Sequence, residues 1–244
     1  MKIAACLIAY NEHRNIKAHL SQYPDWIEKI LVLASIKPWF GPKSDQECMT
    51  WNKIKELNDP RVETVKMYWP KEHEQRSWGL AALKDYDWVF TLDPDEFLTP
   101  EDWQKLRAFL DGCHQAVKCL IPDEMVTYWK DFGHCWDEGG DTHRPVLAVR
   151  PKQTVFWEKR EVLEESRMRL KIKLHHLSWV KSDEEVWQKI NNYSHAVDFD
   201  LRDWFDNVWK KWEPDSFGLM PLKFPKDVKA KEGNLPESIA RLFH

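Results

Sequence analysis

Three carboxylates within four positions form a concentrated set of candidate metal ligands. Asp93, Asp95 and Glu96 follow directly after the apolar run 88–92. Carboxylates this close repel one another unless a cation or hydrogen bonds hold them. Their oxygen atoms suit Mn²⁺ or Mg²⁺, either of which would neutralise a diphosphate leaving group. The segment therefore predicts a divalent-metal site, and an acidic turn that caps the next helix is the alternative.

The elements before this segment alternate between apolar runs and amphipathic stretches. Strands are predicted over 2–9, 29–34, 62–68 and 88–92, with helices over 15–20, 45–57 and 74–84 between them. This order is typical of a parallel sheet with helices on both faces. Ligands of such sheets bind at the carboxyl ends of the strands. Asn11 and Glu12, which follow the first strand, are therefore predicted on the same sheet edge as Asp93–Glu96.

The second half of the chain has a different pattern. A helix with Thr99 as its N-cap is predicted to run to Leu110. Strands over 116–121, 125–129, 146–150, 154–157 and 170–179 follow with no helices between them, which predicts a mixed sheet. Helices are predicted over 183–197 and 201–212, and the prolines and glycines from residue 213 onward predict an irregular tail.

Four segments in the same order resemble family 2 glycosyltransferases with the GT-A fold. Ile3–Glu12 resembles their opening strand, and Leu92–Leu98 is similar to their DxD segment. The remaining similarities lie in Glu74–Arg76 with Gly79, in His175–Val180, in Lys189–Ile190 and in Ser194–His195. The resemblance covers roughly residues 1–197. It implies a Rossmann-like nucleotide-sugar-binding α/β fold, with a mixed central sheet flanked by helices and a short C-terminal helical extension.

The resemblance also implies an organisation and an activity. A GT-A domain would span 1–198, with a nucleotide-sugar-binding half (1–112) and an acceptor-binding half (113–198). A C-terminal helix and irregular tail would follow over 199–244. The implied activity is a metal-dependent hexosyl- or pentosyltransferase that moves a sugar from a nucleotide-sugar to an acceptor hydroxyl, with inversion expected. A glycan or a lipid-linked saccharide is the expected acceptor.

The resemblance also implies nucleotide-binding and metal-binding roles for individual residues. Residues lining the nucleotide pocket would be Ala9, Tyr10, Asn11, Glu12 and Ser35, with Arg76 near the base or diphosphate. Asp93 would contact the ribose or a metal-bound water and Asp95 would ligate Mn²⁺ or Mg²⁺. Ser35 stands where many members have the aspartate that reads uracil, so UDP is the expected nucleotide while the base stays open.

A late histidine would complete the metal site, and His176 is the candidate. It shares the alternating face of its strand with Ile172 and Leu174, which predicts an inward side chain, whereas His175 is predicted to point outward with Lys173. The alternative for His176 is a histidine buried in the core without a ligand.

An inverting transfer needs a carboxylate to accept the proton of the acceptor hydroxyl. The polar loop 131–144 carries Asp137, Glu138 and Asp141, and Asp141 is favoured because Gly139 and Gly140 precede it. The alternative for each carboxylate is a solvated surface position.

Charge and composition leave further classes open. Between Arg144 and Lys181 there are ten basic and four acidic residues, although the whole chain has a net charge of −4. This basic window makes a second acceptor conceivable, namely a hydroxymethylated pyrimidine in DNA, as in phage-type DNA glycosyltransferases. The 15 tryptophans suggest a non-catalytic carbohydrate-binding protein as an alternative of another class. Nucleotidyl transfer is disfavoured, because no glycine-rich loop stands near the N-terminus.

Cysteine content and hydropathy bear on the compartment. Five cysteines without paired spacing predict reduced thiols. The sequence contains no run of 18 apolar residues, so no membrane span is predicted. We therefore expect a cytoplasmic protein.

Overall fold

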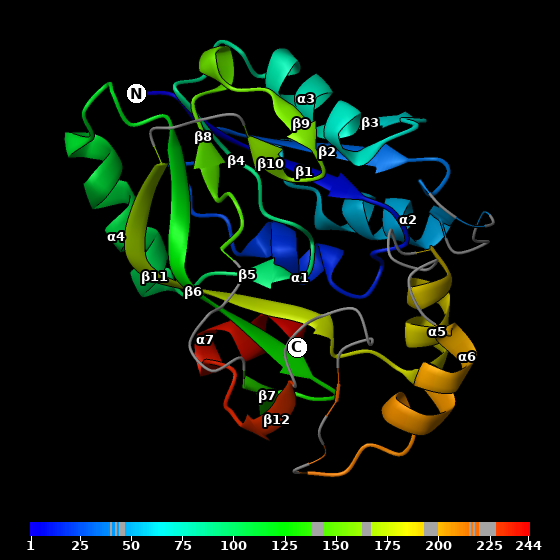
Figure 1. The fold of residues 1–244 in the computed structure, drawn as a ribbon. Coiled ribbons are helices and arrows are strands. Elements are labelled where there is room, and N and C mark those ends of the chain that lie inside the picture. The colour runs from blue at the N-terminus through cyan, green and yellow to red at the C-terminus, as the bar shows by residue number, and fades with distance from the viewer. Residues whose placement is uncertain are drawn as a thin grey trace.

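The computed structural model describes residues 1–39, 41, 43, 47–137, 144–162, 167–192, 200–214, 216, 218–219 and 228–244. Its centre is a mixed sheet (Figure 1). Four strands of this sheet are parallel and lie in the order β3 (Val62–Met67), β2 (Lys29–Ser35), β1 (Ile3–Ala9), β4 (Trp88–Phe90). The carboxyl ends of β1, β2 and β4 therefore lie at one edge, as the alternating pattern predicts.

The second half of the chain extends this sheet with strands of both directions. β8 (Ala148–Val149) is antiparallel to β4, and β6 (Cys119–Trp129) is antiparallel to β8. β11 (Arg167–Trp179) then pairs parallel to β6 and antiparallel to the short β5 (Glu96–Phe97). The acidic segment follows β4 in the chain. It thus lies between β4 and β11, the strand that carries His176.

β1 is apolar along its whole length, and elements packed on both faces of the sheet bury it. On one face its Ile3, Ala5 and Leu7 pack with α1 (Ile16–Ser21), α2 (Glu47–Leu57) and α4 (Pro100–Gly112). On the other face Ala4, Cys6 and Ile8 pack with α3 (Glu72–Ala82) and with the hairpin of β9 (Phe156–Glu158) and β10 (Glu161–Val162). Between β8 and β9 runs the 3₁₀ turn η1 (Pro151–Gln153). The structure confirms the predicted fold class of a mixed central sheet flanked by helices.

A cluster rich in tryptophan joins the C-terminal helices to the far end of the sheet. α5 (Asp183–Asn192) contributes Val186 and Ile190, and α6 (Leu201–Trp204) continues as the π-helical turn η2 (Phe205–Trp209). They pack on Trp129 and Trp179 at the ends of β6 and β11. Four of the eight tryptophans beyond residue 112 are therefore buried core residues, and three more pack against them.

The last part of the chain, predicted as an irregular tail, contains a strand and a short helix. β12 (Lys229–Glu232) pairs with β7 (His134–Asp137), and α7 (Glu237–Ala240) with η3 (Arg241–Phe243) packs near α1. The sequence of β12 alternates lysine with other residues and has low strand propensity, so its strand form comes from pairing with the open edge of β7.

Two further predictions need correction. The predicted strands 116–121 and 125–129 are one strand, β6, and Pro122 is tolerated because it lies beside a shift in the β11 register. His175 is buried rather than outward, with 5% of its surface exposed. The reason is that this side of β11, which also carries Leu177, is covered by Leu235 and Ile239 of the C-terminal segment.

Within the described residues, no helix combines the length and apolar character needed to cross a membrane.

Candidate active site

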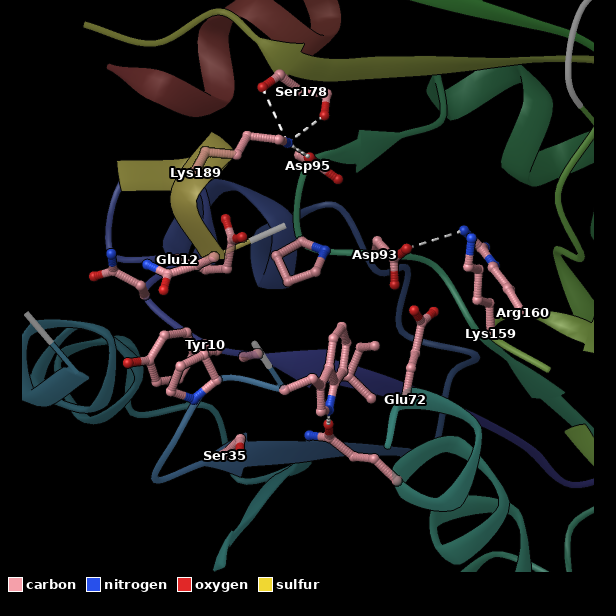
Figure 2. A pocket seen from close by; sticks show the side chains of 18 of the residues that line it. Tyr10, Glu12, Ser35, Glu72, Asp93, Asp95, Lys159, Arg160, Ser178 and Lys189 are labelled. Atoms are coloured by element: carbon pink, nitrogen blue, oxygen red, sulfur yellow. Dashed lines mark hydrogen bonds and ion pairs between the residues drawn. The ribbon is translucent and has the colours of Figure 1, made fainter. Parts of the chain in front are cut away.

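A cavity of about 790 Å³ opens at the carboxyl ends of β1, β2 and β4. Figure 2 shows Tyr10 and Ser35 on one side of it, Lys189 and Ser178 on the opposite side, and Asp93 between them. The described structure brings together in this cavity the predicted nucleotide and metal residues, which are Ala9, Tyr10, Asn11, Glu12, Ser35, Arg76, Asp93, Asp95 and His176. The volume lies within the range of small-molecule sites.

The turn after β1 explains why asparagine and glutamate stand there. Asn11 has a φ of 58°, a left-handed conformation that asparagine adopts more readily than most residues. The backbone N–H of Glu12 donates to the Thr50 hydroxyl at 2.8 Å, which fixes the turn. Among the described residues, Asn11 Oδ1 and Glu12 Oε2 are buried without a hydrogen-bond partner. Such atoms in a cavity wall are suited to receive donors from a ligand.

The Glu12 carboxyl is in an environment that favours its neutral form. Burial raises the pKa of Glu12 to about 7, opposed by Lys181 and reinforced by Asp95. The Lys181 ammonium lies 4.0 Å from Glu12 Oε2. Glu12 therefore changes charge near neutral pH.

Asp93 is held by two arginines. Both of its oxygens accept from Arg76 Nη2, at 2.7 and 3.0 Å, and Arg160 Nη1 lies 3.4 Å away. Arg76 is buried on α3, where it also donates from Nε to Glu72 at 2.9 Å. Although burial disfavours the charged guanidinium, Asp93 and Glu72 raise the pKa of Arg76 above its ordinary value. Because its oxygens are engaged in this way, Asp93 is less available to a metal than Asp95.

Arg160 enters the site from the turn between β9 and β10. Its Nη1 donates to Glu96 Oε1 at 2.5 Å and its Nη2 donates to the Val146 carbonyl oxygen at 2.6 Å. Glu96 also accepts from the backbone N–H of Asp93 at 2.9 Å. These contacts fix the acidic segment as a folded loop. They also set aside the helix-cap alternative, since the cap of α4 is Thr99, which accepts from Asp102 N–H.

Asp95 projects toward His176 and Lys189. Its Oδ2 lies 3.7 Å from His176 Nε2 and 3.7 Å from Lys189 Nζ. Burial lowers the pKa of His176 to about 4, against the attraction of Asp95, so the imidazole is neutral near pH 7. Burial acts to raise the pKa of Asp95, but His176, Lys189 and Lys181 hold it well below its ordinary value.

This pair of donors fits a divalent ion that also binds phosphate. His176 Nδ1 lies 3.2 Å from the Thr127 hydroxyl, which orients the ring with Nε2 toward Asp95. In the described part of the chain, no group of three His, Cys, Asp or Glu side chains is arranged to hold a metal. Mg²⁺ commonly binds through one or two protein carboxylates together with substrate phosphates, and one carboxylate with one imidazole suits Mn²⁺.

The wall beneath Tyr10 has no carboxylate at the end of β2. Ser35 is buried and donates its hydroxyl to the Lys37 carbonyl oxygen at 2.5 Å. Trp39 Nε1 donates to Gln75 Oε1 at 3.2 Å, and Gln75 in turn donates to the Leu33 carbonyl oxygen. This wall offers aromatic and amide surfaces to a base.

Of the three predicted proton acceptors, the structure describes Asp137. Asp137 lies on β7 outside the cavity lining, with its carboxylate 3.3 Å from Lys231 Nζ. Glu138 and Asp141 lie outside the described residues. Trp136, the neighbour of Asp137 on β7, does line the cavity, because successive residues of a strand point to opposite faces. Further carboxylates that line the cavity are Glu158, Glu161 and Glu185.

Several cavity residues were missed by sequence reasoning. One polar stripe of α5 faces the cavity through Glu185, Gln188, Lys189 and Asn192, opposite the buried Val186 and Ile190. Their spacing of three and four residues is a signal that the sequence carries. Arg160 has no such signal, because only the tertiary position of its hairpin brings it to Glu96.

Comparisons with known proteins give distant structural likenesses. No protein-family model matches the chain, and no curated protein sequence matches it. Glucosyl-3-phosphoglycerate synthase from Mycobacterium tuberculosis, solved with Mn²⁺, uridine diphosphate and phosphoglyceric acid, aligns at 19% identity and a TM-score of 0.37. That alignment covers 50% of this chain and 43% of the synthase. S. aureus TarS aligns at 18% identity and a TM-score of 0.37, over 52% of this chain and 36% of TarS.

A third solved structure aligns over more of the chain. The 4-diphosphocytidyl-2C-methyl-D-erythritol synthase from Anaerococcus prevotii aligns at 14% identity and a TM-score of 0.45, over 76% of this chain and 93% of that one. This chain thus spans less than half of the first two proteins. Because all three TM-scores are below 0.5, the chemistry of the cavity is inferred from its own residues.

Proposed function

We propose that the chain is a GT-A glycosyltransferase of the family 2 type, which transfers a sugar from a nucleotide-sugar to an acceptor hydroxyl with Mn²⁺ or Mg²⁺. The observation that carries this proposal is the meeting of three strand-end features in one cavity. These are Asn11–Glu12 after β1, Asp93–Asp95 after β4 and His176 near the end of β11. Polar groups gathered from separate strands at one sheet edge are typical of nucleotide sites in α/β folds.

Each group has a defined part in this mechanism. Tyr10 and Trp39 would flank the base, and Asn11 would receive donors of the nucleotide. Asp95 and His176 would hold the ion, which supplies charge neutralisation for the leaving diphosphate. Arg76 and Arg160 would keep Asp93 oriented beside it. The cations of the cavity would raise the local concentration of the anionic donor.

The acceptor would enter from the side of β7 and α5. Trp136 and Trp179 line the cavity there, with ring centroids 6.2 Å apart and planes inclined by 33°. Aromatic faces of this kind suit the apolar face of a sugar ring, so we favour a glycan or lipid-linked saccharide. As in the sequence prediction, proton acceptance is assigned to Asp141 or Glu138 of the loop 131–144, with inversion as the expected outcome.

The basic window gives DNA less support as an acceptor than its charge suggests. Within the described residues, at least six of its ten basic residues pair with carboxylates, namely Lys152, Arg160, Arg167, Arg169, Lys173 and Lys181. Paired cations offer little charge to phosphates. Binding to duplex DNA that weakens steeply with salt would revive this alternative.

Thermal unfolding with a panel of nucleotide-sugars tests the proposal. A donor present at 100 times its Kd should raise the Tm by roughly 5–10 °C. Asp95→Asn should lose the Mn²⁺-dependent part of that rise and the transfer activity. The matched control Asp111→Asn, on the exposed end of α4, should keep both. Full Mn²⁺-dependent stabilisation in Asp95→Asn would refute the metal site, and a carbohydrate-binding protein would bind saccharides without metal.

A further inference from the structure

The Lys189 ammonium occupies a bonded position beside the Asp95 carboxylate. Its Nζ donates to the Ser178 hydroxyl and, at 3.2 Å, to the Ser178 carbonyl oxygen. Asp95 Oδ2 lies 3.7 Å from the same atom, and the ring centroid of Trp179 is 5.3 Å away. Figure 2 shows these contacts as the dashed lines that meet at Lys189. The Lys189 ammonium thus lies between the carboxyl end of β11 and the acidic segment.

Cations already lie beside the carboxylates of this arrangement. Lys189 lies 3.7 Å from Asp95, and Lys181 lies 4.0 Å from Glu12. An ion that binds Asp95 and His176 would add two positive charges beside a buried ammonium. That repulsion is strong at the low effective dielectric constant of a partly buried site. A diphosphate supplies the negative charge that would remove it.

We propose that Lys189 makes divalent-metal binding conditional on the diphosphate of the donor. Without the nucleotide, the ammonium neutralises Asp95 and opposes the ion. With the nucleotide bound, the Lys189 side chain would turn to the phosphate oxygens, and Asp95 with His176 would be free to hold the ion. Metal and donor then bind with positive coupling, which by linkage is the same in both directions. This inference rests on the proposed function and specifies how its site is loaded.

Lys189→Met tests the inference, because methionine keeps an unbranched apolar chain against Trp179 but removes the charge. Mn²⁺ binding is followed by the electron paramagnetic resonance signal of free Mn²⁺, and uridine diphosphate binding by calorimetry. In the wild type, uridine diphosphate should tighten Mn²⁺ binding at least about tenfold. In Lys189→Met, metal alone should bind about tenfold more tightly and uridine diphosphate alone about tenfold more weakly. The exposed Lys171→Met on β11 is the matched control and should change neither.

The opposite signs of the two changes distinguish this role from a structural one. A residue that only anchors α5 would, when replaced, weaken both ligands, and that result would overturn the inference. Unchanged Mn²⁺ affinity in Lys189→Met would also overturn it and leave the proposed metal site intact. If the wild type binds no Mn²⁺ with or without uridine diphosphate, the metal part of the proposed function fails, and this inference fails with it.

Discussion

At the scale of single residues, Arg160 shows how a buried ion pair shapes the candidate site. Its guanidinium joins Glu96, Asp93 and the Val146 carbonyl oxygen, and Glu96 is only 3% exposed. A buried ion pair contributes little over a well-packed apolar pair, but removing one partner leaves a costly unpaired charge. Arg160 therefore fixes the conformation of the acidic segment more than it adds net stability.

Replacing Arg160 should expose this asymmetry. Arg160→Met should lower the free energy of unfolding by about 1–3 kcal/mol, because the buried Glu96 carboxyl loses its donor and must be protonated or left unpaired. Adding Glu96→Gln should recover most of that loss, since glutamine is neutral and still accepts from Asp93 N–H. Urea unfolding measures both, and Lys152→Met, whose 4.0 Å pair with Asp85 is exposed, should cost less than about 0.5 kcal/mol. Equal stability of the single and double variants would contradict this account.

At the scale of elements, close packing of α3 on β1 and β2 positions Arg76. Gly79 lets the helix approach so closely that an added Cβ would lie 2.3 Å from Cys6 Sγ and 3.0 Å from Leu33 Cδ1. Arg76 lies one turn earlier on the same helix, so a displaced α3 would also move the guanidinium away from Asp93.

Gly79→Ala should destabilise the protein by about 1–3 kcal/mol, the usual cost of overpacking a core. Adding Cys6→Ala should return part of that loss, because it removes the sulfur that the new methyl group meets. Gly112→Ala, near the end of α4 with open space around it, is the control and should be neutral or stabilising. Urea unfolding of the wild type, the two single variants Gly79→Ala and Cys6→Ala, the double variant and the control gives the comparison. Additive losses for Gly79→Ala and Cys6→Ala would refute the contact.

The elements also mark how far the sequence allows prediction. The parallel strands and their helices were predictable because strands buried on both faces form continuous apolar runs between amphipathic helices. The placement of Asn11 and Asp95 at one edge follows from that topology. β5 and β12 were not predictable, because two or four residues carry no measurable period and their form depends on the strands they pair with. The outward assignment of His175 was wrong for a related reason, because alternation along β11 does not show that the C-terminal segment covers its second face.

At the scale of the whole molecule, buried titratable groups set how stability depends on pH. Burial lowers the pKa of His19, His175 and His176 to about 4, so between pH 4 and 6.5 the unfolded chain binds protons that the folded chain does not. Burial raises the pKa of Glu12 and Glu96 to about 7, so between pH 4.5 and 7 the folded chain holds the extra protons. As the pH falls, the lowered pKa values of the histidines therefore decrease the free energy of unfolding, and the raised pKa values of the glutamates increase it.

Among these five groups, three histidines against two glutamates leave about one excess proton on the unfolded chain between pH 4.5 and 6.5, and the lowered pKa of His13 acts in the same direction. The free energy of unfolding should therefore fall by at least about 2 kcal/mol from pH 6.5 to pH 4.5. His175→Gln removes one histidine and should make stability clearly less dependent on pH in this window. Glu12→Gln removes one opposing carboxyl and should roughly double the wild-type change. Urea unfolding at several pH values, with a chelator present, separates these slopes. Identical slopes in the three proteins would show that these buried groups do not control the acid response.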